Sequence, residues 1–493
     1  MTPHLPDAMP APQWVAQPVP VWVSELPDVR DLNLLALCER WPERYPFLLE
    51  SVASGQKQPG VGLDGQPVGT TAESLGRFDI LMAFPQTSDA CLTPEAGQDF
   101  VRGFEQSLVE NGLTPSDSAL ADDTGVAETK TLSLPFTGGW FVYFGYEFAQ
   151  VLEPSLSLPA SNLPLAKWVR IPSAILIDHQ TGHGYLVAEP GFEHRLHTLY
   201  QDLQQVGRVE TSVPEIAVAE IHQDPPQRFT QGVDRIKDYI LAGDVFQVNL
   251  SRQWEVDVKN ASAPNVYRSL RQANPAPFAA YADFGDWQVL SSSPERLVTS
   301  DGEHVATRPI AGTRRRSSDT EKDLALIREL QAHPKEVAEH IMLIDLERND
   351  LGRLSQPGSV AVDELMAIET YQYVHHIVSN IQGRLQPGTS PLDIFAATFP
   401  GGTITGCPKI RCMEIIAELE QTPREAYTGS LGYINRDGRL DSNILIRTFV
   451  QQGERLRFRA GAGIVADSDP EKELAETRHK AKGLLKALRR EMR

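Results

Sequence analysis

The sequence predicts an α+β fold, in which helices and strands do not alternate regularly along the chain. Helical and strand-like segments follow one another in no fixed order, and we find no internal repeat. The segment 245–251 alternates strictly between apolar and polar residues, as strands of antiparallel sheets do. Hydrophobic residues make up 41% of the 493 residues, enough for more than one large core.

The composition argues against several classes of protein. The chain carries 46 basic and 65 acidic residues and a formal charge of −19, so we expect no nucleic-acid and no membrane partner. The four cysteines lack the spacing of a zinc or redox site, which fits a reducing cytoplasm. We read neither a signal peptide nor an apolar run of membrane-spanning length, and therefore expect a cytoplasmic protein.

Prolines and polar runs divide the chain into a tail and two domains. Six prolines lie within residues 1–20, which we expect to form an extended tail. Residues 21–205 contain several apolar runs and are expected to form an N-terminal domain. Residues 206–227 have few helical signals and contain two adjacent prolines, which predicts a linker. The C-terminal domain is expected to span residues 228–493.

Apolar runs predict the strands of the N-terminal domain. A strand is expected to end within residues 45–51, and residues 77–84 have the composition of a buried strand. Residues 138–147 begin with two glycines and are rich in aromatic side chains. They predict closely packed strands, with the lining of a pocket as the alternative.

The C-terminal domain begins with a helix and an alternating strand. Val233, Ile236 and Ile240 share one face of the helix, which is expected to end at Gly243. In the strand at 245–251, Phe246, Val248 and Leu250 point to one side, and the other side carries Gln247, Asn249 and Ser251. This uncharged polar face suits either solvent or a ligand cavity, and the sequence leaves both open.

The last helix is well defined by its cap. Asp469 occupies the N-cap position and Pro470 the first helical position. Apolar residues then recur at helical spacing and give one buried face, formed by Leu474, Ala481, Leu484, Leu485 and Leu488.

Two predicted helices carry paired carboxylates. Glu473 and Glu476 lie one turn apart on the last helix, and Glu336 and Glu339 have the same spacing on a helix that begins near Pro334. Four carboxylates on two helices suit Mg²⁺, which binds a few carboxylates together with waters and a substrate oxygen. Two solvated helix faces are the alternative.

Three segments suit an anionic ligand. Residues 399–409 are expected to form a glycine-rich turn that leads into a helix start, where free backbone amides bind anions; a tight turn with a capped helix is the alternative. Arg447 lies on a predicted strand and has the planar donor geometry that fits a carboxylate. Gly461 and Gly463 permit close approach of a ligand to the backbone, and Lys480 adds a charge. Together they indicate a small molecule with more than one carboxylate.

Two further segments are candidates for proton transfer or ligand contact. Glu295 follows a proline at the end of an apolar strand, where a carboxyl group with a raised pKa acts as a general acid. A surface turn is the alternative. One of the neighbouring pair His375 and His376 is a candidate ligand contact, although most histidines serve structure only.

Five segments resemble the chorismate-utilising enzymes, a family that includes anthranilate synthase component I, aminodeoxychorismate synthase component I, and the isochorismate and salicylate synthases. They are Arg308–Arg314, Ala338–Arg353, Gly401–Lys409, Gly461–Asp467 and Glu473–Thr477. Their order and spacing fit the family from about residue 228 to 490, and the N-terminal half fits through Phe47–Ser51 and Gly138–Trp140.

The resemblance implies a fold and a set of site residues. The family fold is a sandwich of two large, mostly antiparallel β-sheets with helices outside. Glu339 and Glu476 would bind Mg²⁺, supported by Glu336 and Glu473. The implied catalytic residues are Glu295, His376 and Gln247. The implied contacts to the carboxylate and pyruvyl groups of chorismate are Thr313, Gly406, Tyr433, Arg447, Gly461, Gly463 and Lys480.

Other residues bear on the branch of the family. Isochorismate and salicylate synthases carry a lysine at the position of Gln247 to activate water, so the resemblance favours an aminating enzyme. The sequences around Asn249, Asn274 and Asn443 resemble aminodeoxychorismate synthases. Ala311 instead resembles anthranilate synthases, because well-known aminodeoxychorismate synthases carry a lysine there as a proposed covalent nucleophile.

We therefore predict an enzyme that converts chorismate to 4-amino-4-deoxychorismate for p-aminobenzoate and folate synthesis. The alternatives are anthranilate synthase component I and a non-catalytic regulator that binds chorismate or tryptophan. Family members take ammonia from a glutaminase subunit, so such a partner is expected. Leu48, Leu49, Glu50 and Ser51 resemble the effector motif of anthranilate synthases and suggest a tryptophan site, with an ordinary strand end in the core as the alternative.

Overall fold

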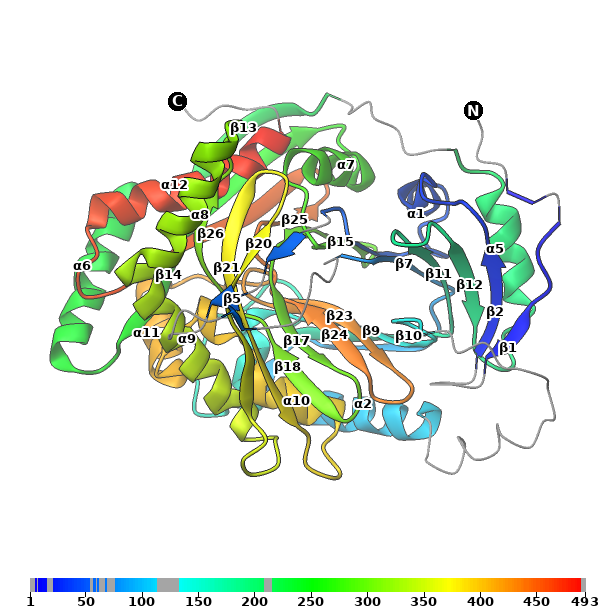
Figure 1. Ribbon diagram of the computed structural model, residues 1–493, viewed down its shortest axis with the longest axis horizontal. Coiled ribbons are helices and arrows are strands. Elements are labelled where there is room, and N and C mark those ends of the chain that lie inside the picture. Colours follow the sequence, from blue (N-terminus) through cyan, green and yellow to red (C-terminus); the bar gives the residue numbers. More distant parts are fainter. Residues whose placement is uncertain are drawn as a thin grey trace.

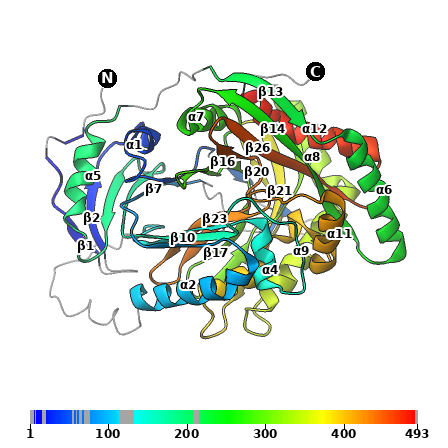
Figure 2. The same ribbon diagram turned by 180° about the vertical axis from the view of Figure 1, so that it is seen from behind.

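The computed structural model describes residues 5–6, 8–15, 21–53, 56–58, 60–61, 67–68, 76–112, 133–207 and 215–488. Its strands form two large antiparallel sheets that face each other as a sandwich, with helices on the outer faces (Figures 1 and 2). The predicted α+β class and the predicted sandwich are therefore confirmed. Among the described residues, no helix is long and apolar enough to cross a membrane.

The first sheet contains thirteen of the described strands. In spatial order they are β1 (Gln13–Val15), β2 (Val21–Leu26), β12 (Gly184–Ala188), β11 (Ser173–Asp178), β7 (Phe78–Ala83), β3 (Phe47–Glu50), β15 (Phe278–Asp283), β16 (Gln288–Ser293), β25 (Thr448–Gln452), β26 (Arg455–Ile464), β14 (Gln247–Lys259) and β13 (Ala217–Gln223), with β22 (Gly406–Cys407) beside β14.

The second sheet contains eleven of the described strands. Their order is β4 (Gln56–Gln58), β20 (Ala361–Thr370), β21 (Val374–Arg384), β18 (His304–Thr307), β17 (Arg296–Ser300), β24 (Leu440–Asn443), β23 (Ser430–Asn435), β9 (Gly139–Phe144), β10 (Ala166–Ile171) and β8 (Ser88–Cys91), with β19 (Ile310–Arg315) beside β21. The short strands β5 (Gly60–Val61) and β6 (Pro67–Val68) pair with each other.

Helices cover both outer faces. One set packs on the first sheet: α1 (Leu34–Arg40), α5 (Arg195–Leu203), α7 (Ala263–Ala273) and α12 (Pro470–Ala487). Another set packs on the second sheet and on β14: α2 (Gly97–Asn111), α6 (Pro226–Ala242), α9 (Pro334–Gly352), α10 (Pro391–Thr398) and α11 (Lys409–Glu420). The remaining helices are α4 (Ala149–Leu152) and α8 (Thr320–Ala332), with 3-10 turns η1 (Pro94–Ala96), η3 (Tyr146–Phe148) and η4 (Gly402–Ile404).

The core between the sheets is aromatic where residues 138–147 cross it. Phe47 of β3 stacks on Phe141 of β9, with ring centroids 3.9 Å apart. Phe141 and Tyr143 belong to the buried cluster that both sheets share. The glycine-led aromatic segment therefore packs between the sheets, which was the favoured of its two predicted roles.

Each of the two expected domains contributes strands to both sheets. β3 pairs with β15 in the first sheet, and β9 pairs with β23 in the second. Residues 206–227, the expected linker, include β13 and the first residues of α6. Strand β1, which lies in the expected tail, pairs with β2 of the expected N-terminal domain.

Strand β14 is buried on both faces near its start. Val248 and Leu250 are buried as predicted, and the polar residues Gln247, Asn249 and Ser251 are buried as well. The polar face is therefore buried and does not face solvent, which was one of its two predicted roles. Phe246 departs from the expected pattern: it precedes the strand and is 68% exposed.

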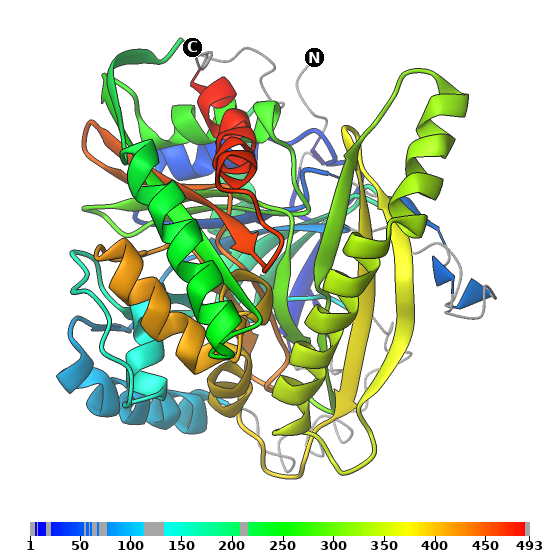
Figure 3. The same ribbon diagram turned by 90° about the vertical axis from the view of Figure 1, so that its left-hand side faces the viewer.

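The predicted cap of α12 is confirmed. The Asp469 carboxylate accepts hydrogen bonds from the backbone amides of Glu471 and Lys472, at 3.1 and 3.0 Å. All five predicted apolar residues of this helix are buried. In Figure 3, α12 (red) and α6 (green) lie on one side of the end of β26, and α9 (yellow-green) lies on the other.

Candidate active site

Two strands of the first sheet form the floor of the candidate site. Gln247 and Asn249 of β14 lie beside Gly461 and Gly463 of β26. A Cβ atom on Gly461 would lie 2.6 Å from Asn249 Oδ1, and a Cβ atom on Gly463 would lie 2.6 Å from Gln247 Nε2. Only glycine leaves room for these amide side chains. Gln247 Oε1 and Asn249 Oδ1 are buried and have no hydrogen-bond partner among the described residues.

Gly406 of β22 packs closely against β14 beside this floor. It has a φ of +130°, and a Cβ atom there would lie 2.1 Å from the carbonyl oxygen of Gln247. The site therefore depends on glycine at this position as well. The helix that follows begins at Lys409 after Pro408. Cys407 is half-buried, and this burial raises the pKa of its thiol.

Lys480 and Tyr427 approach the floor from above Gly461. Lys480 Nζ donates a hydrogen bond to the Gly461 carbonyl at 3.0 Å and lies 2.8 Å from Glu476 Oε1. A Cβ atom on Gly461 would also lie 2.7 Å from the Tyr427 hydroxyl. The glycine backbone is thus bordered by one cationic group and one phenol.

Glu295 is the buried acid of the site. Glu295 is 5% exposed, and burial raises its pKa to about 7, against the opposing effects of the Thr403 hydroxyl, the Ile310 backbone amide, and the charges of Arg447 and Lys480. Glu295 Oε1 and the nearby Thr403 Oγ1 are both buried, and neither has a hydrogen-bond partner among the described residues. A carboxyl group in this state holds a proton near neutral pH and has a free oxygen for a ligand.

His376, Thr313 and Arg447 form the next part of the site. His376 Nδ1 lies 2.8 Å from Thr313 Oγ1. Burial, and next the positive charge of Arg447, lower the pKa of His376 to about 3, so its imidazole is neutral. Arg447 has a φ of +52°, a strained conformation for arginine that is typical of functional positions. The neighbouring His375 contacts Asp323 and Thr370 and serves the structure.

The predicted metal-binding glutamates are placed on two helices, as expected, but each has a protein partner. Glu336 pairs with Arg314 at 3.0 Å, and Glu476 pairs with Lys480. Glu473 is buried, and Glu339 also interacts with other groups. The carboxylate chemistry fits Mg²⁺, and Glu476 is 47% exposed, which leaves room for waters.

A metal-like cluster occurs elsewhere. Among the described residues, the group with three ligand atoms within 4.8 Å of one another consists of Glu220, His222 and Asp257. It lies on β13 and β14 at the edge of the first sheet, is largely exposed, and does not include the predicted residues.

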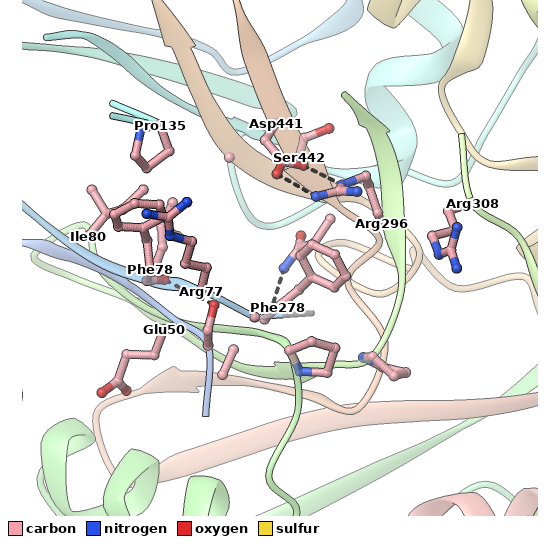
Figure 4. A pocket seen from close by; sticks show the side chains of 18 of the residues that line it. Glu50, Arg77, Phe78, Ile80, Pro135, Phe278, Arg296, Arg308, Asp441 and Ser442 are labelled. Atoms are coloured by element: carbon pink, nitrogen blue, oxygen red, sulfur yellow. Dashed lines mark hydrogen bonds and ion pairs between the residues drawn. The ribbon is translucent and has the colours of Figure 1, made fainter. Parts of the chain in front are cut away.

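A second cavity, of about 380 Å³, lies between the sheets (Figure 4). Leu49, Glu50 and Ser51 line it, as do Phe278 and Arg296. Leu48 does not; it packs in the core beneath the outer helices. The suggested effector motif thus borders a cavity through three of its four residues.

Tyr433 lies in this second cavity and not beside Arg447. It is part of the core between the sheets, and its ring packs edge-on against Phe136. The tyrosine that borders Gly461 is Tyr427, six positions earlier. The structure thus places Tyr427, and not the predicted Tyr433, beside Gly461 on the floor of the candidate site.

Two other residues near Glu295 had no predicted role. Thr403 lies on η4 between the predicted glycines. Glu347 of α9 is buried next to the Asp350–Lys409 ion pair, and burial raises its pKa to about 8. Only the packing of α9 against η4 brings it here, so no sequence pattern marks it.

The comparisons with known proteins agree with this geometry. Residues 93–486 match the family model described as chorismate binding enzyme. The chain is 42% identical over 364 residues to aminodeoxychorismate synthase component 1 of Bacillus subtilis, which covers 72% of this chain and 77% of the relative. It is 36% identical over 516 residues to anthranilate synthase component 1 of Synechocystis, which covers 97% and 95%.

A solved structure gives the same result. Anthranilate synthase component I from Streptococcus pneumoniae superimposes with a TM-score of 0.70 at 30% identity, over 84% of this chain and 94% of that one. Relatives of both names are thus similar to this chain to a comparable degree. The chain belongs to the chorismate binding enzyme family.

Proposed function

We propose that this chorismate-utilising enzyme aminates chorismate to 4-amino-4-deoxychorismate, in the cytoplasm, for the p-aminobenzoate and folate route. The observation that carries the aminating reaction is the buried, uncharged amide of Gln247 on the site floor. An amide is a poor base, so it does not activate water, whereas ammonia attacks without losing a proton first.

In the proposed reaction, the C4–O bond of chorismate breaks and a C–N bond to ammonia forms. Glu295, protonated near neutral pH, gives its proton to the departing hydroxyl, which leaves as water. The new ammonium group then returns one proton to the Glu295 carboxylate, so that the acid is restored. Arg447 and Lys480 neutralise the substrate carboxylates.

Mg²⁺ is part of the proposal. Glu339 and Glu476 would hold it, with Glu336 and Glu473 in support, and the ion would supply positive charge for a substrate carboxylate. The ion pairs of Glu336 with Arg314 and of Glu476 with Lys480 must then loosen.

Ala311 supports a route without a covalent enzyme intermediate. It lies on β19, is 8% exposed, and offers only a methyl group. Ammonia itself, or another nucleophile, must therefore open the reaction. The same alanine favours the second candidate, anthranilate synthase component I. This candidate is also supported by the relative of that name that covers 97% of the chain.

Two partners complete the proposal. Both relatives carry "component 1" in their names, which supports a glutaminase subunit as the source of ammonia.

Tryptophan is proposed for the second cavity, where Leu49, Glu50 and Ser51 lie. Apolar walls and charged groups in one cavity suit an amino acid with an aromatic side chain.

Product analysis tests the proposed function. The purified chain, chorismate, Mg²⁺ and ammonium should give a product that aminodeoxychorismate lyase converts to p-aminobenzoate, with little anthranilate. Mass and fluorescence distinguish the products, because anthranilate forms without added lyase. Anthranilate as the main product would establish the second candidate, and no turnover at all would leave the non-catalytic regulator.

A further inference from the structure

Arg252 is a buried arginine whose donors are only partly paired. It lies on β14 and is 1% exposed. Its Nη2 atom donates to Gln223 Oε1 at 3.2 Å and to the Asp224 carbonyl at 2.7 Å. Its Nε and Nη1 atoms are buried and have no hydrogen-bond partner among the described residues. Burying a charged group without its hydrogen bonds is costly, so these atoms indicate an acceptor from outside the chain.

The groups around Arg252 do not offset its charge. Burial, and next the positive charge of Arg478, lower the pKa of Arg252, and the Asp224 carboxylate opposes them with a smaller effect. That carboxylate accepts a hydrogen bond from the Gln253 amide at 2.8 Å. The Trp254 ring lies 5.0 Å from the guanidinium carbon, and its cation–π contact accepts no N–H group in the plane of the guanidinium. Arg252 therefore lacks a counter-ion.

A small cavity of about 20 Å³ borders Arg252. The first turn of α6, the middle of β14 and the end of α11 surround it. Its charged lining consists of three arginines and two carboxylates, namely Arg228, Arg252, Arg459, Asp224 and Glu420. The positive charges thus exceed the negative ones in a chain whose formal charge is −19.

The two carboxylates of the cavity are already engaged. Glu420 accepts hydrogen bonds from Arg459 at 2.9 Å and from Arg424 at 2.6 Å, so two arginines share its one charge. Arg228 donates to the Leu419 carbonyl at 3.2 Å and forms no ion pair with a described carboxylate. The cavity therefore adjoins two arginines, Arg228 and Arg252, for which the described residues provide no charge-paired partner.

The size of the cavity restricts its ligand. A volume of this order holds one particle of about the size of a water molecule, which excludes phosphate, sulfate and organic acids. Water would fit but would bring no charge. A monatomic anion accepts several N–H donors at once and neutralises the arginines, and the N-terminus of α6 adds a favourable dipole.

We propose that this cavity binds one chloride ion, with Arg252 as its main ligand and Arg228 as the second positive group. The ion would join α6 and the end of α11 to β14, the strand that carries Gln247 and Asn249 on the floor of the candidate site. Its role is to stabilise the fold, so this inference does not depend on the proposed amination.

The test measures the melting temperature in sodium chloride and in sodium gluconate at equal ionic strength and pH, with salt varied up to about 100 mM. Gluconate is too large for the cavity. Arg252→Met keeps most of the apolar stem and removes the guanidinium. The control is Arg170→Met on β10, because Arg170 is also buried but pairs with Glu189, at 2.7 Å between Nη1 and Oε1.

We expect chloride to raise the melting temperature of the wild type above that in gluconate by about 1–3 °C, in a saturable way, because it binds the folded state alone. Arg252→Met should lose this difference. Arg170→Met should melt at a lower temperature in both salts, since Glu189 is left unpaired, and should retain the difference.

Equal melting temperatures of the wild type in the two salts would overturn the inference, as would an equal effect of chloride in the wild type and Arg252→Met. If Arg252→Met does not fold, wild-type crystals grown in 100 mM sodium bromide decide. An anomalous bromide peak within about 3.5 Å of Arg252 Nε or Nη1 supports the site. An ordered water there without anomalous signal, or a peak that needs molar bromide and is thus an adventitious ion only, rejects it.

Discussion

The candidate active site and the second cavity lie on either side of one short segment and differ in how their charges are arranged. Glu295 faces the active site, and Arg296, the next residue, lines the second cavity. In the active site, Glu295 Oε1 is unpaired and its pKa is raised to about 7. In the second cavity, Arg296 forms two hydrogen bonds to Asp441, at 2.8 and 2.9 Å (Figure 4).

The same contrast extends to the neighbours of these residues. Arg308, which lines the second cavity, is paired with both Glu364 and Glu369, and Tyr371 donates to Glu369 at 2.7 Å. Paired charges hold a cavity in shape, whereas unpaired groups with shifted pKa values are available for chemistry. We therefore expect changes in the two regions to affect different properties.

The largest effect is expected from the glutamates proposed to bind Mg²⁺. Glu339→Gln or Glu476→Gln should abolish turnover and leave the fold intact, because a neutral amide does not offset the charge of the ion. Activity is measured at limiting Mg²⁺, with circular dichroism to check the fold. Unchanged turnover in both variants would contradict the metal site.

Replacing the buried acid should lower the rate constant and spare binding. Glu295→Gln is expected to reduce kcat by about 10²-fold or more, because the departing hydroxyl loses its proton donor. Steady-state kinetics with ammonium check this. If only KM rose, Glu295 would bind the substrate without acting as the acid.

A matched change in the second cavity should do the opposite. Glu369→Gln removes one of the two carboxylates paired with Arg308 and should lower the free energy of unfolding by about 1–3 kcal/mol, with kcat within twofold of the wild type. Urea unfolding and kinetics on the same sample measure both. A large loss of kcat without loss of stability would erase the distinction between the two regions.

The raised pKa of Glu295 also predicts a dependence of stability on pH. Its carboxyl group binds a proton more tightly in the folded state than in the unfolded state, so its contribution is fully present below pH 4.5 and is lost as pH rises through about 7. Wild-type protein should therefore lose about 2–3 kcal/mol more stability than Glu295→Gln between pH 5 and pH 8. Equal losses in urea unfolding at the two pH values would contradict the shift.

The smallest effect is expected from tryptophan. Binding in the second cavity should raise the melting temperature and leave the Glu295 site chemically unchanged, since binding to the folded state alone stabilises it. Calorimetric titration measures the affinity. Absence of heat, with no tryptophan retained from purification, would remove this ligand from the proposal.

Local patterns predicted much of the fold and part of the site. The alternation of apolar and polar residues located β14, and the capping residues located α12, because both signals depend only on residues close together in the sequence. The choice between Tyr427 and Tyr433 was beyond such patterns, since it depends on which face of β23 meets the other sheet. Glu347 likewise reaches the site only through the packing of a helix.

The predicted glutamates show a similar limit. The helical spacing of Glu336, Glu339, Glu473 and Glu476 gave the right elements and places Lys480 one turn after Glu476, but it does not reveal the arginine partner of Glu336. Arg314 is more than twenty residues from Glu336 in sequence, and its position depends on the bulge in β19.

The pairing of early with late strands has a consequence for how the protein is made. Residues 47–50 pair with 279–282, and residues 139–144 pair with 430–435. While the ribosome is still translating the second half, β3 and β9 each lack a neighbour and present an open edge, which favours association with other nascent chains. Contacts between such distant segments also form slowly. We therefore expect the two halves, expressed as separate polypeptides, to be poorly soluble alone and to recover a folded enzyme only when they are produced together.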